Sequence, residues 1–310
     1  IVKKYPYIDG FAAVINPFIC VIYYISYFKL KKFLFVWSNS PEPFIFIPFM
    51  PKRRIHTFHG PWLEERRLDR RSLLVPKLLY PILTRRASGL LHFNSKYVRN
   101  TVLKETRSIE NRKWLTLPVL INEKKIIAAK NRDSLKRNSN DDALELLLPR
   151  RLVHRTGVLE FISTFDKIST PAKLTITGTG YLSNGVKELV YGKPKISFKG
   201  EVSHRELEAM FNACDAVVMP SIGAEGFGVP IIEALFRRKP VLYTDVGGMA
   251  EFFSESPGGY VFTLGDSRSL EVALETILDR KRKGISFFDV DDVPYNFENN
   301  VSRILKNAFY

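Results

Sequence analysis

Short apolar runs alternate with helical patterns through the second half of the chain, and this alternation constrains the fold more than any other feature. The apolar runs have the length and composition of buried strands and occupy residues 144–148, 173–177, 215–219 and 240–243. Helical patterns lie between them, at about residues 157–167, 203–212 and 229–237. Strands that alternate with helices predict an α/β fold with a parallel sheet and helices on both of its faces. Ligands of such sheets bind at the carboxyl ends of the strands.

The first half of the chain has weaker signals of the same kind. Strand-like runs occur at residues 33–37, 54–58 and 89–93, and helical stretches lie within residues 72–86 and 95–105. Residues 131–142 are polar and charged, which is typical of a linker between domains. We therefore expect two α/β domains, at residues 1–140 and 141–295. The amphipathic pattern that ends the chain predicts a helix within residues 296–310, which would pack back on the first domain.

The length and composition agree with two domains and a reducing environment. A chain of 310 residues that is 45% hydrophobic is long enough to form two cores. Its two cysteines, Cys20 and Cys214, lie far apart, so neither a disulfide framework nor a zinc site is expected. The sequence therefore predicts a cytoplasmic protein. The first residue is Ile1, so we also expect that the front of the chain is truncated.

The net charge of +15 comes from the first half of the chain, because Lys and Arg nearly balance Asp and Glu after about residue 150. A basic half indicates either an anionic partner or simply a solvated basic face. An anionic membrane surface and a phosphate-bearing acceptor are both candidate partners. Nucleic acid is not favoured, because the sequence has no recognisable nucleic-acid-binding module.

One apolar segment, residues 11–28, has only just the length needed to cross a bilayer. Asn16 and Pro17 interrupt it, and a buried helix followed by the strand at residues 33–37 explains it equally well. We therefore favour a buried helix with peripheral membrane association, and a membrane span is the less favoured alternative.

The segment from Glu225 to Glu233, EGFGVPIIE, is the most informative for chemistry. Gly226 and Gly228 allow the backbone to approach a ligand closely, and Pro230 suits the first turn of a helix. Free N–H groups at a helix start bind anions or hydroxyls. The two carboxylates would be offset by only ~4.5 Å along the helix axis and so can face one cleft, where they would bind sugar or ribose hydroxyls. Carboxylates near a helix start also have a purely structural explanation.

In its context, this segment resembles glycosyltransferase family 4, the group 1 glycosyl transferases of the GT-B fold. Pro220 and Ser221 precede a Glu-x7-Glu pattern, as they do in that family. Further similarity lies at residues 150–162, 178–180, 198–200 and 239–253, and weaker similarity at residues 56–62 and 94–102. The resemblance implies two Rossmann-like domains that face each other across a cleft.

The resemblance also implies roles for single residues. Glu225 would lie beside the transferred sugar, and His59 would reach that sugar from the first domain. Arg151 would neutralise the departing diphosphate.

Other residues would bind the rest of the donor. Glu233 would hold the ribose, and Val202, next to Glu201, would lie by the nucleobase. Backbone amides of Gly226, Phe227 and Gly228 would contact sugar hydroxyls or phosphates. Gly178 falls in another loop of the donor site.

Two departures from the family pattern stand out. The family has a lysine at the position of Thr156, and Arg155, or otherwise His154, would have to supply the missing cation. The family's first domain also opens with a strand and a glycine-rich loop, whereas Gly10 is the only glycine in the first fifty residues. We therefore expect a shortened and incomplete first domain.

The implied function is a retaining, metal-independent transfer of a sugar from a nucleotide-diphosphate sugar to a hydroxyl, without a cofactor. A lipid-linked or polysaccharide glycan is the expected acceptor. The alternative is a non-catalytic relative that binds a nucleotide sugar or a glycan without turning it over. A glycoside hydrolase also uses two carboxylates, but Glu233, inside the helix, suits the ribose better than a scissile bond.

Overall fold

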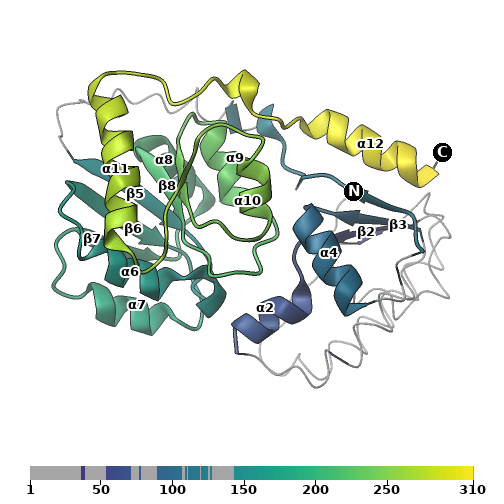
Figure 1. Ribbon diagram of the computed structural model, residues 1–310, viewed down its shortest axis with the longest axis horizontal. Coiled ribbons are helices and arrows are strands. Elements are labelled where there is room, and N and C mark those ends of the chain that lie inside the picture. Colours follow the sequence, from purple (N-terminus) through teal and green to yellow (C-terminus); the bar gives the residue numbers. More distant parts are fainter. Residues whose placement is uncertain are drawn as a thin grey trace.

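The chain folds into two α/β domains that lie side by side (Figure 1). The computed structural model describes residues 36–38, 54–70, 77, 89–106, 109, 111–118, 120–124, 126–127 and 143–309. The apolar segment 11–28 and the linker 131–142 lie outside these residues, as does the helical stretch 72–86 apart from Lys77. The strand expected at residues 33–37 is described only from Val36, where β1 begins.

The second domain is built on six parallel strands in the order β10-β9-β8-β5-β6-β7. The strands are β5 (Leu144–Pro149), β6 (Ala172–Thr177), β7 (Ile196–Gly200), β8 (Ala216–Met219), β9 (Val241–Tyr243) and β10 (Gly259–Val261). The helices are α6 (Val158–Phe165), α7 (Ser183–Val190), α8 (His204–Ala213), α9 (Val229–Leu235), α10 (Gly247–Phe253) and α11 (Ser267–Arg282). The predicted α/β class and the parallel sheet are confirmed.

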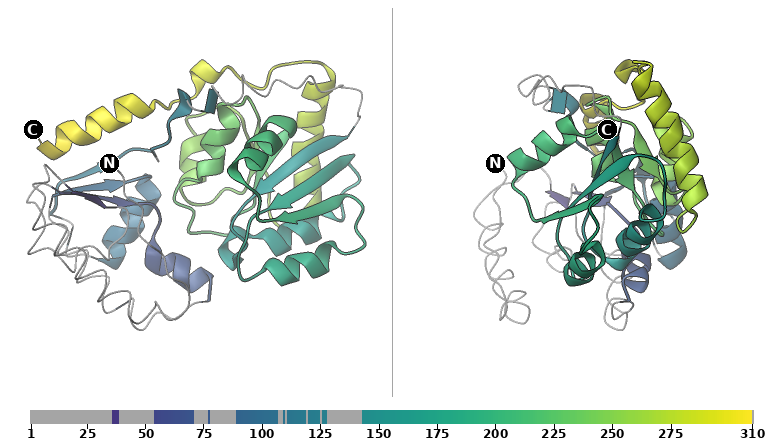
Figure 2. Two further views of the ribbon diagram at one scale, coloured as in Figure 1. Left: turned by 180° about the vertical axis from the view of Figure 1, so that it is seen from behind. Right: turned by 90° about the vertical axis from the view of Figure 1, so that its left-hand side faces the viewer.

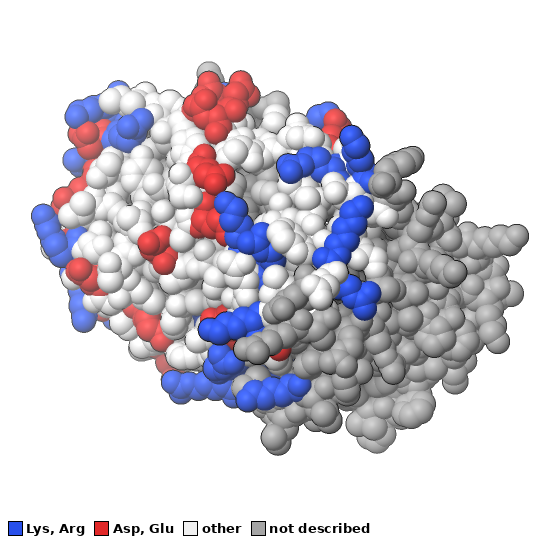
Figure 3. All heavy atoms as spheres, turned by 45° about the vertical axis from the view of Figure 1, so that its right-hand side comes forward, with Lys and Arg blue, Asp and Glu red and all other residues white. Residues whose placement is uncertain are grey.

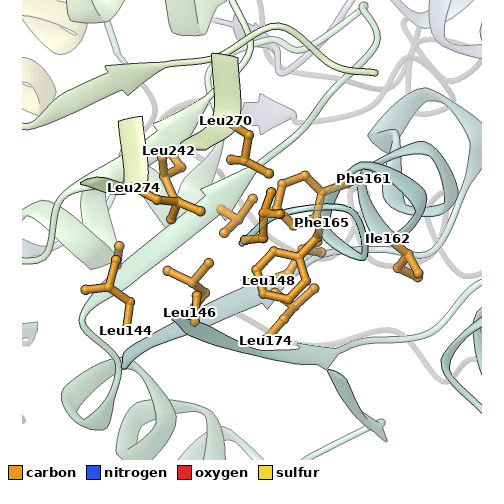
Figure 4. Packing of buried hydrophobic residues seen from close by; sticks show 14 of the residues in the cluster. Leu144, Leu146, Leu148, Phe161, Ile162, Phe165, Leu174, Leu242, Leu270 and Leu274 are labelled. Carbon is orange, nitrogen blue, oxygen red and sulfur yellow. The ribbon is translucent and has the colours of Figure 1, made fainter. Parts of the chain in front are cut away.

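Two apolar layers cover the two faces of this sheet. Leu144, Leu146 and Leu148 of β5 pack with Phe161 and Phe165 of α6 on one face (Figure 4). α7 and α11 contribute to the same layer. Leu147, between these leucines, belongs instead to the opposite layer with α8, α9 and α10. Successive side chains of a strand point to opposite faces, so a nearly continuous apolar run such as β5 requires helices on both sides.

The first domain has a smaller parallel sheet in the order β1-β2-β3-β4. Its strands are β1 (Val36–Ser38), β2 (Arg54–Phe58), β3 (Leu90–Phe93) and β4 (Trp114–Thr116), and its helices are α2 (Trp62–Leu68) and α4 (Lys96–Glu105). Phe58 and Phe93 stack at the centre of its core, against Leu63 of α2 and Val98 of α4. The sequence patterns did not predict α2 or β4.

The last helix, α12 (Phe297–Phe309), runs beside the first domain, as both views of the chain show (Figures 1 and 2). Its Ile304 is fully buried with Ile55, Leu90 and Leu117, which come from the first domain. Lys124 forms an ion pair of 2.8 Å with Glu298 at the start of this helix. The chain thus crosses between the domains twice, which brings the end of the sequence back to the first domain.

Charge is distributed unevenly over the surface. On the face shown in Figure 3, Lys and Arg side chains gather in a band next to the residues drawn in grey, whereas most Asp and Glu lie on the second domain. Within the described residues, no helix combines the length and apolarity needed to cross a bilayer.

Candidate active site

The carboxyl ends of strands from both sheets meet where the domains touch. β2 is followed by His59 and β3 by Asn94, and the Asn94 side-chain amide donates a hydrogen bond of 2.7 Å to the His59 carbonyl oxygen. Gly226 of the second domain packs against the same carbonyl, so closely that a Cβ at this position would overlap it. The glycine is therefore required by direct contact between the domains, in addition to any contact with a ligand.

The loop that contains Gly226 connects β8 to α9. Two positions in it have positive φ, Ala224 at 51° and Gly228 at 89°. The backbone N–H of Gly248 in α10 donates to the Glu225 carbonyl at 2.9 Å. A Cβ at Gly248 would overlap the carbonyl oxygen of Gly226, so α10 lies directly against this loop. Positive φ at a buried alanine is a strained conformation that its surroundings must hold, and such strain is found mainly at functional sites.

Glu225 is buried, and its carboxylate forms an ion pair with Arg150. The hydroxyl of Ser221 donates to the same carboxylate at 3.0 Å. Burial opposes ionisation of Glu225, but the guanidinium groups of Arg150 and Arg155 outweigh it, so that its pKa is lowered. The carboxylate is thus a permanent anion at neutral pH. The sequence analysis did not assign a role to Arg150, although it directly precedes Arg151 at the end of β5.

A pocket of about 310 Å³ lies at the carboxyl edge of the six-stranded sheet. It is lined by Pro149, Arg150, Arg151, Thr177, Gly178, Thr179, Glu201, Val202 and Leu207. Three residues predicted to bind the donor, Arg151, Gly178 and Val202, therefore meet in one pocket. A Cβ at Gly178 would overlap the carbonyl oxygen of Arg150, which explains why this turn has a glycine with a φ of 125°.

Thr156 and Arg155, which were predicted to lie near the diphosphate, do not line this pocket. Thr156 is buried, and its Oγ1 lies 2.9 Å from the Arg151 carbonyl oxygen and 2.6 Å from that of Val153. Its hydroxyl stabilises the short turn η3 (His154–Thr156). The guanidinium of Arg155 points to Asp69 and Glu65 in the first domain, at 3.4 and 3.9 Å.

Glu233 and His59 also do not line the pocket at the carboxyl edge of the six-stranded sheet. Glu233 is half-buried in α9, and burial raises its pKa, an effect that nearby Arg237 and His204 only partly offset. His59 is exposed, yet desolvation by the surrounding protein lowers its pKa from the usual value of 6.5, so that the imidazole is neutral at pH 7. A neutral imidazole both donates and accepts hydrogen bonds.

His92, a buried histidine of β3 in the first domain, has structural contacts. His92 Nε2 donates to the Leu117 carbonyl at 2.9 Å, and Nδ1 lies 3.1 Å from the Thr57 hydroxyl. Burial lowers the pKa of His92 to about 4. In the described part of the chain, no three His, Cys, Asp or Glu side chains gather in a way that would hold a metal ion.

A second pocket, of about 230 Å³, lies between the domains. Asn94, Lys96, Arg99 and Thr116 line it from the first domain, and Phe227, Gly248, Glu251 and Phe252 from the second. Asn94 Oδ1 and Thr116 Oγ1 are buried and have no hydrogen-bond partner among the described residues.

The chain is similar in sequence to proteins named as glycosyltransferases. It is 32% identical to an uncharacterized glycosyltransferase of Methanocaldococcus jannaschii over 124 residues, which cover 38% of this chain and 32% of that protein. It is 34% identical to the O-antigen chain mannosyltransferase RfbU of Salmonella typhimurium over 107 residues, covering 34% of this chain and 29% of RfbU. These matches thus span only about a third of each relative.

The fold is similar over nearly the whole chain to that of a protein solved with a nucleotide and a sugar. HepE of Anabaena, in complex with UDP and glucose, matches with a TM-score of 0.67 and 17% identity, covering 97% of this chain and 84% of HepE. Such a low identity shows the fold alone. The family described as glycosyl transferases group 1 matches residues 129–285, which are half of the chain. The chain therefore belongs to the glycosyl transferases group 1 family.

Proposed function

We propose that this protein transfers a sugar from a nucleotide-diphosphate sugar to a hydroxyl group, with retention of the anomeric configuration. The observation that carries the proposal is the pocket at the carboxyl edge of the six-stranded sheet, where Arg151, Gly178 and Val202 meet. This edge is where open α/β sheets bind ligands, and the domain that forms it belongs to a family of glycosyl transferases. HepE, which shares the fold, was solved with UDP and glucose.

In the proposed reaction, the bond between the anomeric carbon and the diphosphate oxygen breaks, and the acceptor oxygen bonds to the same face of that carbon. The acceptor proton passes to the departing diphosphate. Negative charge grows on the diphosphate as the bond breaks, so the main demand on the protein is electrostatic stabilisation. Arg151, which is exposed on the pocket wall, would supply it together with amides of the loop at Gly226. No step of this proposal requires a metal or a cofactor.

The carboxylates would hold the donor rather than attack it. Glu225 is fixed by Arg150 and Ser221, which favours a positioning role near the sugar over a nucleophilic one. Glu233, one turn inside α9, would accept a hydrogen bond from a ribose hydroxyl. Neutral His59 would contact the sugar from the first domain and help to exclude water when the cleft is closed.

The acceptor is proposed to be a lipid-linked or polysaccharide glycan that binds between the domains. The pocket there has two buried oxygens, on Asn94 and Thr116, that a hydroxyl-bearing ligand would satisfy, and Phe227 and Phe252 offer apolar surface beside them. The similar protein RfbU is an O-antigen chain mannosyltransferase, which supports an acceptor that is itself a growing chain. The basic first half would then bind an anionic membrane surface from the cytoplasm.

Sugar release from nucleotide sugars, measured with the wild type and with Arg151→Gln, tests the proposal. The wild type should release sugar from at least one donor, and the variant should be markedly slower. Binding of a nucleotide sugar without any turnover would favour the second candidate, a non-catalytic relative. The observation that favours this candidate is the neutral, buried Thr156 at the position of the family lysine.

A further inference from the structure

We propose that Asp69 and Arg155 form a latch that holds the phosphate-binding side of the donor pocket against the first domain, with Asp69 as the positioning residue. This inference rests on the proposed function. It gives Arg155 a different role from the one predicted from the sequence, where it replaced the missing lysine as a diphosphate cation.

The latch is built on the turn that follows Arg151. Asp69 ends α2 in the first domain, and one of its carboxylate oxygens accepts the backbone N–H of Arg155 at 3.1 Å. The other oxygen lies 3.4 Å from Arg155 Nε. The Arg155 guanidinium also lies 3.9 Å from Glu65, one helical turn before Asp69. A single carboxylate therefore accepts a hydrogen bond from the main chain of Arg155 and forms an ion pair with its side chain, whose Nε makes no hydrogen bond among the described residues.

Tyr181 adds a second connection between the same segments. Its hydroxyl accepts the backbone N–H of His154 at 2.8 Å and donates to the Asp69 carbonyl oxygen at 3.3 Å. The turn η3 is thus bound at two successive amides, by Asp69 and by Tyr181. Arg151 lies three residues before this turn, and the Thr156 hydroxyl at the end of the turn donates to the Arg151 carbonyl oxygen at 2.9 Å, so a shift of the turn against the first domain would be passed to Arg151.

The ion pair between Asp69 and Arg155 is largely buried, so breaking it should cost more free energy than breaking an exposed pair. The Asp69 side chain is only 8% exposed and the Arg155 side chain 15% exposed. Exposed ion pairs contribute little, but removing one partner of a buried pair leaves an uncompensated charge. If the domains separated, both side chains would be hydrated again. The ion pair therefore stabilises only the arrangement in which the two domains are in contact.

The charges around the pocket account for why Arg155 is not available to the donor. Arg150 is paired with Glu225, and Arg155 with Asp69 and Glu65. Arg151, which is exposed on the pocket wall, is then the arginine of this group that is left to meet a diphosphate. A buried guanidinium between two carboxylates gains little by turning to a phosphate, because it would leave two anions unpaired.

Charge-removal and charge-exchange variants test the latch. The set is Asp69→Asn, Arg155→Gln, the double variant, and the exchange Asp69→Arg with Arg155→Asp. Asp279→Asn and Lys283→Gln are the matched controls, since these residues form an exposed pair of 2.8 Å on α11 and at its end, away from the domain contact.

Small-angle X-ray scattering of the ligand-free proteins reports domain separation. Sugar release from nucleotide sugars reports turnover, and titration with uridine, adenosine and guanosine diphosphates reports affinity.

The latch predicts that both single variants and the double variant show the same increase in radius of gyration and the same loss of turnover, on the order of tenfold. The exchange variant should regain at least part of both, and the controls should match the wild type. If Arg155 is instead a diphosphate cation, Arg155→Gln weakens nucleotide binding while Asp69→Asn, which frees Arg155, strengthens it. That opposite behaviour, or an unchanged radius of gyration in both single variants, would overturn the proposal.

The scattering measurement separates this inference from the proposed function. If no variant and no wild type binds any of the three nucleotides, the donor site is refuted. A matched increase in radius of gyration in Asp69→Asn and Arg155→Gln would still support the latch in that case.

Discussion

The backbone of Gly226 in the second domain lies against the carbonyl oxygen of His59 in the first domain, with no room for a side chain between them. This contact joins the loop of the Glu-x7-Glu pattern to the carboxyl end of β2. It means that the conformation of the loop and the closure of the domains are directly coupled.

Gly226→Ala should therefore prevent the observed closure. The clash is with backbone, which no change of side-chain rotamer relieves. We expect turnover to fall by more than tenfold, about 1.4 kcal/mol in transition-state stabilisation, while nucleotide binding to the second domain remains. Gly185→Ala is the matched control, because a Cβ there meets only the Leu159 side chain, at 3.9 Å. Equal turnover in the two alanine variants would disprove the coupling.

Removing the charge of Glu233 should chiefly weaken nucleotide binding, whereas removing that of Glu225 should chiefly lower turnover. Glu233→Gln should weaken nucleotide binding by roughly 1.5–3 kcal/mol, the value of a hydrogen bond to a charged group, and this is measured by titration calorimetry. Glu225→Gln should mainly lower turnover. It should also lower the melting temperature, because it leaves Arg150 buried without a counter-charge. Wild-type nucleotide affinity in Glu233→Gln would be incompatible with the proposed ribose contact.

Thr156→Lys should strengthen binding of nucleoside diphosphates. Arg155 is held by two carboxylates, so a new ammonium group at residue 156 would add to the positive charge that Arg151 supplies on the pocket wall. We expect a gain that is an appreciable part of ~1.5–3 kcal/mol. Thr156→Val, which has a similar shape, controls for loss of the hydroxyl, whose contacts hold η3. If Thr156→Lys binds no better than Thr156→Val, the pocket has no need of a further cation.

Glu105 should make the stability of the first domain depend on pH. Burial raises its pKa from 4.5 to about 7, and the nearby Glu64 adds to the shift. Between these values the folded protein holds a proton that the unfolded chain has released, so stability falls as pH rises through this range. Glu105→Gln should thus raise the melting temperature relative to the wild type at pH 8 but hardly at pH 5. Glu188→Gln, on the surface of α7, is the control, and a pH-independent difference for Glu105→Gln would contradict this account.

The sequence predicted the strongly apolar strands of the second domain, β5, β6, β8 and β9, but not the less apolar β7 and β10 or the helices α7, α10 and α11. Runs such as LELLL at residues 144–148 can be satisfied only by burial on both faces, and β5 does lie at the centre of the sheet with apolar layers on each side. α2 was missed for the opposite reason. It has one buried residue, Leu63, and its run of charged residues gives no helical periodicity of apolar side chains.

The site was predicted in part. Local spacing indicated the glycine-rich loop, whereas the roles of Arg151 and Val202 were implied by the family resemblance and stay predictions. The pairs Arg150–Glu225 and Asp69–Arg155 could not be predicted, because 75 and 86 residues separate the partners and only the folded chain brings them together. Arg155, which the sequence suggested as a cation for the donor, is instead paired with Asp69 and Glu65 of the first domain.

The most direct test of the central claim is titration calorimetry of the wild type and Arg151→Gln with uridine, adenosine and guanosine diphosphates. The account predicts that the wild type binds at least one of them and that Arg151→Gln binds it at least tenfold more weakly, about 1.4 kcal/mol. No binding by the wild type, or equal binding by the two proteins, would contradict a donor site at the carboxyl edge of the six-stranded sheet.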